Sequence, residues 1–241
     1  MLKKLTAIVL HTKKYKESSL LVYAYTNTFG RQTYVVNGVR TEKNKTGVAL
    51  FQPLTLLDAV AYHNPKSELQ RLSEYRLLQP LQSIPFDITK NALALFMGEI
   101  LYKTIREQEP NAELFDFLYR TILDLDKIQE GVANFHLYFL VRLCHYLGYA
   151  PDKNHNQELS FFDAQAGEFT IIRPSHDLFF DAQQTQLFAK LLDINPESLY
   201  QLPLNREQRN LFIANMLSFL NHHFDSVVTI RSVTILQEIF N

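Results

Sequence analysis

The chain has 241 residues, 46% of them apolar, which is enough to form a substantial core in one large domain or two modest ones. Its one cysteine, Cys144, excludes a disulfide framework and a thiolate-rich zinc site. Residues 1–80 carry 12 Lys and Arg against 5 Asp and Glu, whereas residues 81–241 carry 12 against 20. Net charges of +7 and −8 indicate a polyanionic partner for the first segment and different partners for the second.

The N-terminus begins like an export signal, because Lys3 and Lys4 precede an apolar stretch. The segment His11-Thr-Lys-Lys14 ends that stretch too early for a signal peptide. No run reaches the roughly 18 consecutive apolar residues that a membrane-spanning helix needs. We therefore expect a soluble protein of a reducing compartment.

The first 80 residues contain β-rich runs separated by turn residues. The predicted strands cover residues 5–11, 20–26, 32–37, 54–62 and 69–78. One long basic loop, Val39–Thr46, follows the third strand. Five short strands with one long loop are typical of a small Greek-key barrel of the OB type.

Apolar residues recur at helical spacing after Pro85. The predicted helices lie at about residues 93–101, 114–125, 133–147, 185–192, 206–224 and 232–240. Asn111 is the expected N-cap of the second helix. The third helix is apolar around more than half of its circumference, so we expect it at the centre of a bundle, ending at Gly148.

A short hairpin is predicted between the third and fourth helices, with strands at residues 159–162 and 169–172 and a turn at Gly167. The predicted fold class is therefore α+β. An OB-type barrel over residues 1–80 is followed by an α-helical domain over residues 81–241, with a hairpin insertion at about 152–175.

Seven cations of the first segment are candidate DNA contacts: Lys13, Lys14, Lys16, Arg31, Arg40, Lys43 and Lys45. The last three lie in a loop between Gly38 and Gly47, and a cationic loop with glycines can follow a phosphate backbone and displace its counterions. The alternative is an ordinary solvated barrel loop, with the lysine run serving solubility.

Three tyrosines of the predicted strands, Tyr23, Tyr25 and Tyr34, are candidates for stacking on bases. Tyrosine in a strand is more often a half-buried packing residue. The sequence leaves open which of the three points outward.

Seven short motifs occur in order along the chain: Glu17-Ser-Ser-Leu, Gly30-Arg31, Val36-Asn-Gly38-Val-Arg40, Gln52-Pro53-Leu-Thr55, Glu113-Leu-Phe115, Leu147-Gly-Tyr149-Ala-Pro151 and Arg231-Ser232. This series, which covers nearly the whole chain, resembles the RecO family of bacterial recombinational repair proteins. The resemblance implies an OB barrel packed on a helical domain. It also implies binding of single- and double-stranded DNA without sequence specificity, annealing of complementary strands, and help in loading RecA onto coated DNA.

The partners that the resemblance implies are RecR, the acidic C-terminal tail of single-stranded-DNA-binding protein and, indirectly, RecA. It implies a protein of the bacterial cytoplasm, associated with the nucleoid and not with a membrane. Many family members carry a four-cysteine zinc module after the Leu-Gly-Tyr segment. Residues 152–175 contain no cysteine, so we expect the hairpin to hold its shape by packing. His155, Asp163 and His176 are too scattered to predict a metal site, and no cofactor is expected.

A second departure lies in the central helix, where the family often has Arg-Phe-Glu and this chain has Asn134-Phe-His136. Phe135, Tyr138 and Arg142 share a stripe of the predicted helix and are the candidate site for the partner's C-terminal peptide. Arg142 would supply the cation missing from the motif. The alternative is that Arg142 pairs with an internal carboxylate such as Asp116 or Asp124.

No glycine-rich nucleotide-binding motif, Walker sequence or nucleophile elbow occurs in the chain, so we do not expect an enzyme. Two other functions stay open. One is an adaptor whose barrel docks proteins without acting on DNA, and the other is an RNA-binding OB module.

Overall fold

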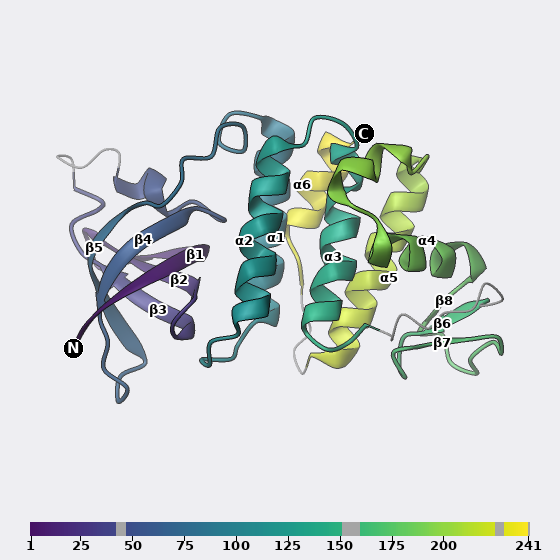
Figure 1. Ribbon diagram of the computed structural model, residues 1–241, viewed down its shortest axis with the longest axis horizontal. Coiled ribbons are helices and arrows are strands. Elements are labelled where there is room, and N and C mark those ends of the chain that lie inside the picture. The colour runs from purple at the N-terminus through teal and green to yellow at the C-terminus, as the bar shows by residue number, and fades with distance from the viewer. Residues whose placement is uncertain (42–46, 151–159, 225–228, 241) are drawn as a thin grey trace. The chain divides into compact units, whose positions relative to one another are not determined.

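The computed structural model describes residues 1–41, 47–150, 160–224 and 229–240 (Figure 1). Contacts divide the chain into two compact units, Met1–Lys127 and Ile128–Asn241. The first unit contains the barrel and the two helices that follow it. The domain boundary expected after residue 80 falls between the barrel and these helices and stays a prediction. Within the described ranges, no helix combines the length and hydropathy needed to cross a membrane.

Five strands close into a barrel in the order β1-β2-β3-β5-β4 (Figure 1). They are β1 (Leu2–Tyr15), β2 (Ser19–Thr26), β3 (Gly30–Val36), β4 (Leu56–Tyr62) and β5 (Leu69–Leu77). Neighbouring strands are antiparallel except β3 and β5, whose parallel pairing closes the barrel. A short 3-10 helix, η1 (Gly47–Phe51), lies between β3 and β4. The α+β class and the OB-type barrel predicted from the sequence are confirmed.

Side chains of the barrel strands alternate between its core and its outer face. In β2, Leu20, Val22 and Ala24 belong to the core cluster. The pairing of β1 with β2 shifts register between Val9 and His11. Beyond this irregularity His11 lies opposite Tyr23, so a histidine and a tyrosine meet on the outer face.

Helices α1 (Ile88–Thr104) and α2 (Ala112–Lys127) complete the first unit. Gly98 lets α1 approach β1 closely, because a Cβ added there would lie only 2.9 Å from the carbonyl oxygen of Leu10. The side chain of Asn111 accepts a hydrogen bond from the backbone N–H of Leu114 at 3.0 Å, which confirms the predicted N-cap of α2.

The segment between β5 and α1 is tied to the end of α2 by Asp126. Its carboxylate accepts hydrogen bonds from the backbone N–H groups of Gln82, Ser83 and Ile84 at 2.7–2.9 Å. Burial alone would raise the pKa of Asp126, but these donors and the nearby Lys90 ammonium outweigh burial and leave its pKa below the ordinary value. The connection from barrel to helices is therefore fixed by a charged anchor.

The second unit is built around α3 (Phe135–Tyr146), in which every residue from Phe135 to Val141 is buried. It packs against α4 and α5, so the expected central helix is confirmed. The other elements are η2 (Val132–Asn134), α4 (Ala182–Asp193), η3 (Pro196–Gln201), α5 (Arg206–His223) and α6 (Ser232–Ile239).

The predicted hairpin forms part of a three-stranded sheet in the order β7-β6-β8. Its strands are β6 (Phe161–Asp163), β7 (Glu168–Thr170) and β8 (Phe179–Phe180), and Gly167 takes a positive φ of 72° in the turn. Residues 151–159 of the insertion, His155 included, lie outside the described residues. Among the residues that are described, no group of three or more His, Cys, Asp or Glu side chains could hold a metal ion.

Candidate nucleic-acid interface

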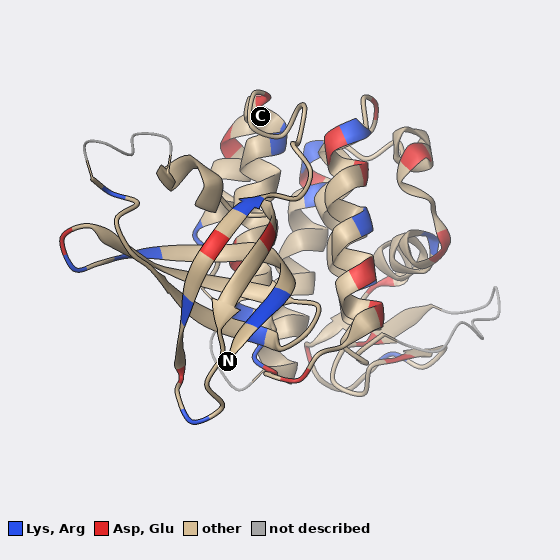
Figure 2. Cartoon of the chain, turned by 60° about the vertical axis from the view of Figure 1, so that its left-hand side comes forward, with Lys and Arg blue, Asp and Glu red and all other residues tan. Residues whose placement is uncertain are grey.

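The β1–β2 hairpin carries three exposed lysines. Lys13 and Lys14 lie near the end of β1 and pair with Leu21 and Leu20 of β2. Lys16 occupies the turn, with a positive φ of 51°. All three side chains are exposed. The hairpin therefore presents the predicted lysine run to solvent. Figure 2 marks in blue where Lys and Arg occur along the backbone.

Arg40 lies beside the turn of this hairpin, although it follows β3. Its backbone N–H donates to the carbonyl of Ser18 at 3.1 Å, and its Nη1 donates to the carbonyl of Lys16 at 3.2 Å. The structure thus brings Arg40 and Lys16 together. Lys43 and Lys45, the other two predicted loop cations, lie outside the described residues.

Arg31 is half-buried and has a structural role in addition to its charge. Its Nη1 donates to the carbonyls of Tyr102 and Ile105 at the C-terminal end of α1, where the helix has unpaired carbonyls. Burial lowers the pKa of Arg31 from its ordinary value, but an arginine stays charged at any physiological pH.

Lys13 and Arg31 approach the same aromatic rings from two strands. Lys13 Nζ lies 5.7 Å from the centre of the Tyr23 ring, and the guanidinium carbon of Arg31 lies 5.9 Å from it. Five of the seven predicted DNA contacts therefore fall into two groups. Lys13 and Arg31 lie on the outer face of β1–β3, and Lys14, Lys16 and Arg40 lie at and beside the hairpin turn.

The three candidate tyrosines have three different environments. Tyr34 points into the barrel core and is 1% exposed. Tyr25 points outward but is also 1% exposed, because Phe115 of α2 covers it with a ring-centre distance of 6.2 Å. Only Tyr23 among them is half-exposed and in contact with the cations.

Sequence reasoning missed two aromatic side chains beside Tyr23. His11 and Tyr102 have ring centres 4.6 Å apart, and Tyr102 lies 4.8 Å from Tyr23. Burial and the positive charge of Lys13 hold the pKa of His11 below its ordinary value. The alternation of His11 and Lys13 in β1 could have placed His11 on the outer face, but no sequence signal links Tyr102 to the barrel.

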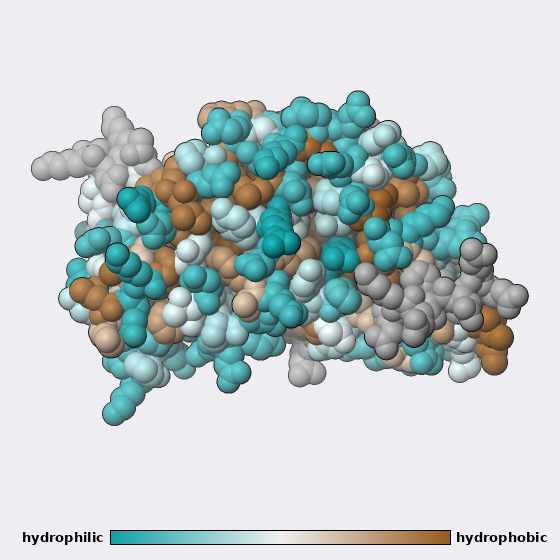
Figure 3. Space-filling model, in the orientation of Figure 1, coloured by the Kyte–Doolittle hydropathy of each residue, from teal (hydrophilic) through white to brown (hydrophobic). Residues whose placement is uncertain are grey.

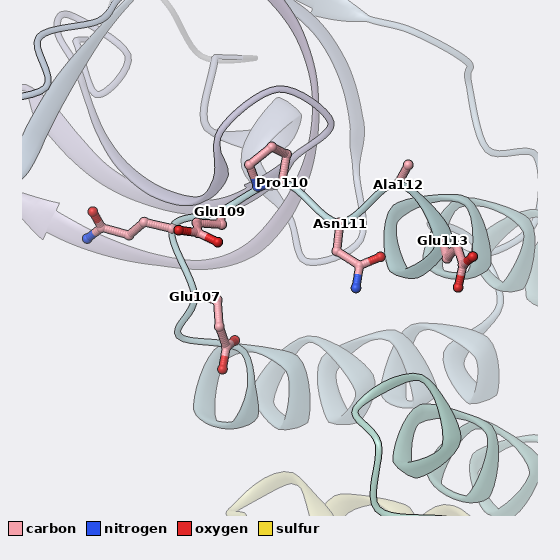
Figure 4. A pocket seen from close by; sticks show the side chains of 7 residues that line it. Glu107, Glu109, Pro110, Asn111, Ala112 and Glu113 are labelled. Carbon is pink, nitrogen blue, oxygen red and sulfur yellow. The ribbon is translucent and has the colours of Figure 1, made fainter.

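An acidic hollow of about 880 Å³ borders this face at the α1–α2 connection (Figure 4). Glu107, Glu109 and Glu113 are among its lining residues, and the backbone N–H of Arg31 donates to the carbonyl of Glu107 at 2.9 Å. Three carboxylates repel phosphate. They make this border of the face unfavourable for a polyanion.

The predicted peptide site in α3 is not an open surface. Phe135 is fully buried and Tyr138 is 7% exposed, so both pack in the core. Arg142 is half-buried, and its Nη1 donates to the carbonyl of Leu192 in the last turn of α4 at 2.7 Å. The hydrogen-bond partner seen for Arg142 is thus a backbone carbonyl of α4 within the same unit. Binding of a partner's peptide at this site stays a prediction.

Cys144, the lone cysteine, is fully buried in α3, and burial raises the pKa of its thiol. It packs as a small apolar side chain.

Comparison with known proteins accounts for both parts of the chain. The family model described as "Recombination protein O N terminal" matches residues 1–81, and the model described as "Recombination protein O C terminal" matches residues 85–226. Proteins named DNA repair protein RecO are similar over the whole chain. The protein of Bacteroides fragilis is 35% identical and that of Phocaeicola vulgatus 32% identical, and each alignment covers 100% of both chains. The protein of Flavobacterium psychrophilum is 33% identical, with 99% of both chains covered. With both family models in order and relatives that match from end to end, this chain belongs to the recombination protein O family.

Proposed function

We propose that this chain is a DNA repair protein that binds single- and double-stranded DNA through its barrel, without sequence specificity, and anneals complementary strands. The observation that carries the proposal is the pair of exposed lysines at the β1–β2 hairpin, Lys14 and Lys16, with the half-buried Arg40 beside them. Within the described part of the chain, Lys14, Lys16 and Arg40 have no carboxylate partner, so their charges remain available to phosphate.

Annealing requires bound strands that lose their mutual repulsion and still move past each other. A cationic surface of flexible side chains satisfies both conditions, whereas a tight base-reading pocket would hold each strand in place. The cations at the hairpin turn form such a cationic surface and not a base-reading pocket. The protein would therefore act by binding and not by catalysis.

The relatives are named for DNA repair, and the family resemblance extends the proposal to partners. These are RecR, the acidic tail of single-stranded-DNA-binding protein, and RecA as the recombinase loaded onto the coated DNA. The excess of 20 acidic over 12 basic residues in residues 81–241 disfavours DNA binding there and leaves that part for protein partners.

Salt dependence tests the proposal. If about four to six cations neutralise phosphates, the logarithm of the affinity for a single strand falls with the logarithm of salt concentration at a slope of about −3 to −4. Replacing Lys14, Lys16 and Arg40 together by alanine should reduce the slope by about 2 and slow the annealing of labelled complementary strands.

Lys66→Ala is the matched control, because Lys66 is an exposed lysine of the same barrel in the β4–β5 turn. It should leave the slope unchanged. A triple variant that keeps the wild-type slope and annealing rate would refute the proposal.

The adaptor alternative is supported by one observation. An apolar groove of about 650 Å³ lies between η1 and the segment that leads into α1, with Leu50, Pro53, Leu77 and Phe86 among its lining residues. Phe86 is 83% exposed, and Figure 3 shows apolar patches between hydrophilic side chains on the surface. If the barrel only docks proteins, the triple variant should anneal strands as the wild type does. Preference for structured RNA over single-stranded DNA would instead favour the RNA-binding alternative.

A further inference from the structure

Three aromatic rings form a half-exposed cluster where α1 packs on the barrel. Tyr23 of β2 and Tyr102 of α1 meet edge to face, with ring centres 4.8 Å apart and an interplanar angle of 67°. His11 of β1 lies 4.6 Å from Tyr102 and 6.0 Å from Tyr23. All three elements belong to the first compact unit, so the cluster is a property of that unit alone.

Two cations cover these rings. The guanidinium carbon of Arg31 lies 4.7 Å from the centre of the Tyr102 ring, and Lys13 Nζ lies 6.0 Å from it. Lys103 is also near but is paired with Glu99 at 3.3 Å. Within the described residues neither Lys13 nor Arg31 has a carboxylate partner. The cluster thus combines aromatic surface with two cations that form no ion pair among the described residues.

This combination matches the chemistry of an unpaired nucleotide, which has a flat base beside a charged phosphate. Bases stack on aromatic side chains whatever their sequence, and cations beside the rings hold the backbone. Bases of a duplex are already stacked and paired, so they cannot use such a surface without being pulled out of the helix.

We propose that His11, Tyr23 and Tyr102 form a stacking subsite for one unpaired base of a DNA strand, with Lys13 and Arg31 beside its phosphate. The inference rests on the proposed function and deepens it, because it assigns the stacking of an unpaired base to a place distinct from the cationic hairpin turn. Lys13 has a flexible stem and moves from the ring face to the phosphate when the base arrives. Arg31 is fixed by the carbonyls at the end of α1 and keeps the position of its charge.

The test compares oligonucleotides with and without bases. Affinities of the full chain are measured for a thymidine oligonucleotide of about 16 nucleotides, for an abasic strand of the same length and for the corresponding duplex. Tyr23→Leu should weaken binding of the thymidine strand by about 5- to 150-fold, the effect of losing one stacked base. It should leave binding of the abasic strand and of the duplex unchanged.

Two further variants separate stacking from folding. Tyr23→Phe keeps the aromatic ring and should keep the wild-type affinity. If only Tyr23→Leu loses affinity, the affinity depends on the ring. Tyr62→Leu, which replaces an exposed tyrosine at the end of β4, should bind as the wild type does.

The outcomes distinguish the inference from the proposed function. If Tyr23→Leu binds the thymidine strand as tightly as the wild type, or loses equal affinity for the abasic strand, the stacking subsite is wrong and DNA binding stands. If the wild type binds none of the three ligands, the proposed function itself fails.

Discussion

His136 is a fully buried histidine at the beginning of α3, stacked on Phe240 with ring centres 5.7 Å apart. Burial, and then the positive charge of Arg209, lower its pKa from 6.5 to about 3. In the unfolded chain the imidazole takes up a proton near pH 6.5, whereas in the folded chain it stays neutral down to about pH 3. The unfolded state therefore binds more protons across this window, so stability is lost as the pH falls.

We expect the free energy of unfolding to fall below pH 6.5 by up to about 1.4 kcal/mol per pH unit from this residue. His136→Leu should remove that contribution, which urea unfolding between pH 7 and pH 4.5 measures. His222→Leu, at an exposed position near the end of α5, should keep the wild-type dependence. Equal slopes for the wild type and His136→Leu would show that His136 does not couple folding to protons.

At the same scale, the tyrosines show what a sequence leaves open. Alternation along β2 and β3 places Tyr23 and Tyr34 in a strand but does not decide which face is inside. Which side chains face the core depends on the strand register of the barrel. The burial of Tyr25 depends in addition on Phe115, which covers it and is about 90 residues away in the chain. Whether a given tyrosine is buried or half-exposed therefore depends on elements distant in the sequence, which the local pattern of residues does not reveal.

Strands and helices were predictable where the element is long enough for its hydrophobic periodicity to be recognised. The five barrel strands and the six longer helices lie where the sequence places them. β8 was missed because two residues, Phe179–Phe180, show no period, and η1 because a 3-10 helix of five residues resembles a loop. The association of Arg31 with α1 was missed for another reason. It depends on the approach of α1 to β1, which one glycine permits.

The small sheet of the second unit is held by phenylalanines. Phe162 of β6 is fully buried, and its ring centre lies 4.6 Å from Phe188, 5.3 Å from Phe180 and 5.5 Å from Phe219. These rings belong to the sheet, to α4 and to α5, so one side chain joins three elements. Packing of these rings therefore stabilises the hairpin, as predicted from the absence of cysteines in residues 152–175.

We expect Phe162→Ala to lower the free energy of unfolding by about 3–5 kcal/mol, because it removes a fully buried ring and leaves a cavity. Phe161→Ala is the control, since Phe161 is the preceding residue of the same strand and is only half-buried. Phe161→Ala should lower the free energy of unfolding by clearly less than Phe162→Ala does. Equal effects of the two substitutions in urea unfolding would mean that the phenylalanine cluster does not hold the sheet.

At the scale of the whole molecule, charge is segregated along the chain. The formal net charge is −1 and the pI is about 6.7, yet the excess of basic residues is confined to residues 1–80. Attraction between charges falls off within about 10 Å at 0.1 M salt. A strand bound at the barrel would therefore respond to the cations near it and little to the net charge of the chain.

Binding at two pH values distinguishes a local site from a net-charge effect. Between pH 6.5 and pH 8 the chain passes its pI of about 6.7 and becomes net negative. Burial and the positive charge of Lys13 lower the pKa of His11 from its ordinary value, which favours the neutral imidazole. We expect fluorescence anisotropy of a labelled single strand to give the same salt slope, about −3 to −4, at both pH values. A slope that collapses above the pI would mean that the net charge of the chain governs binding, and the hairpin cations would then not be the site.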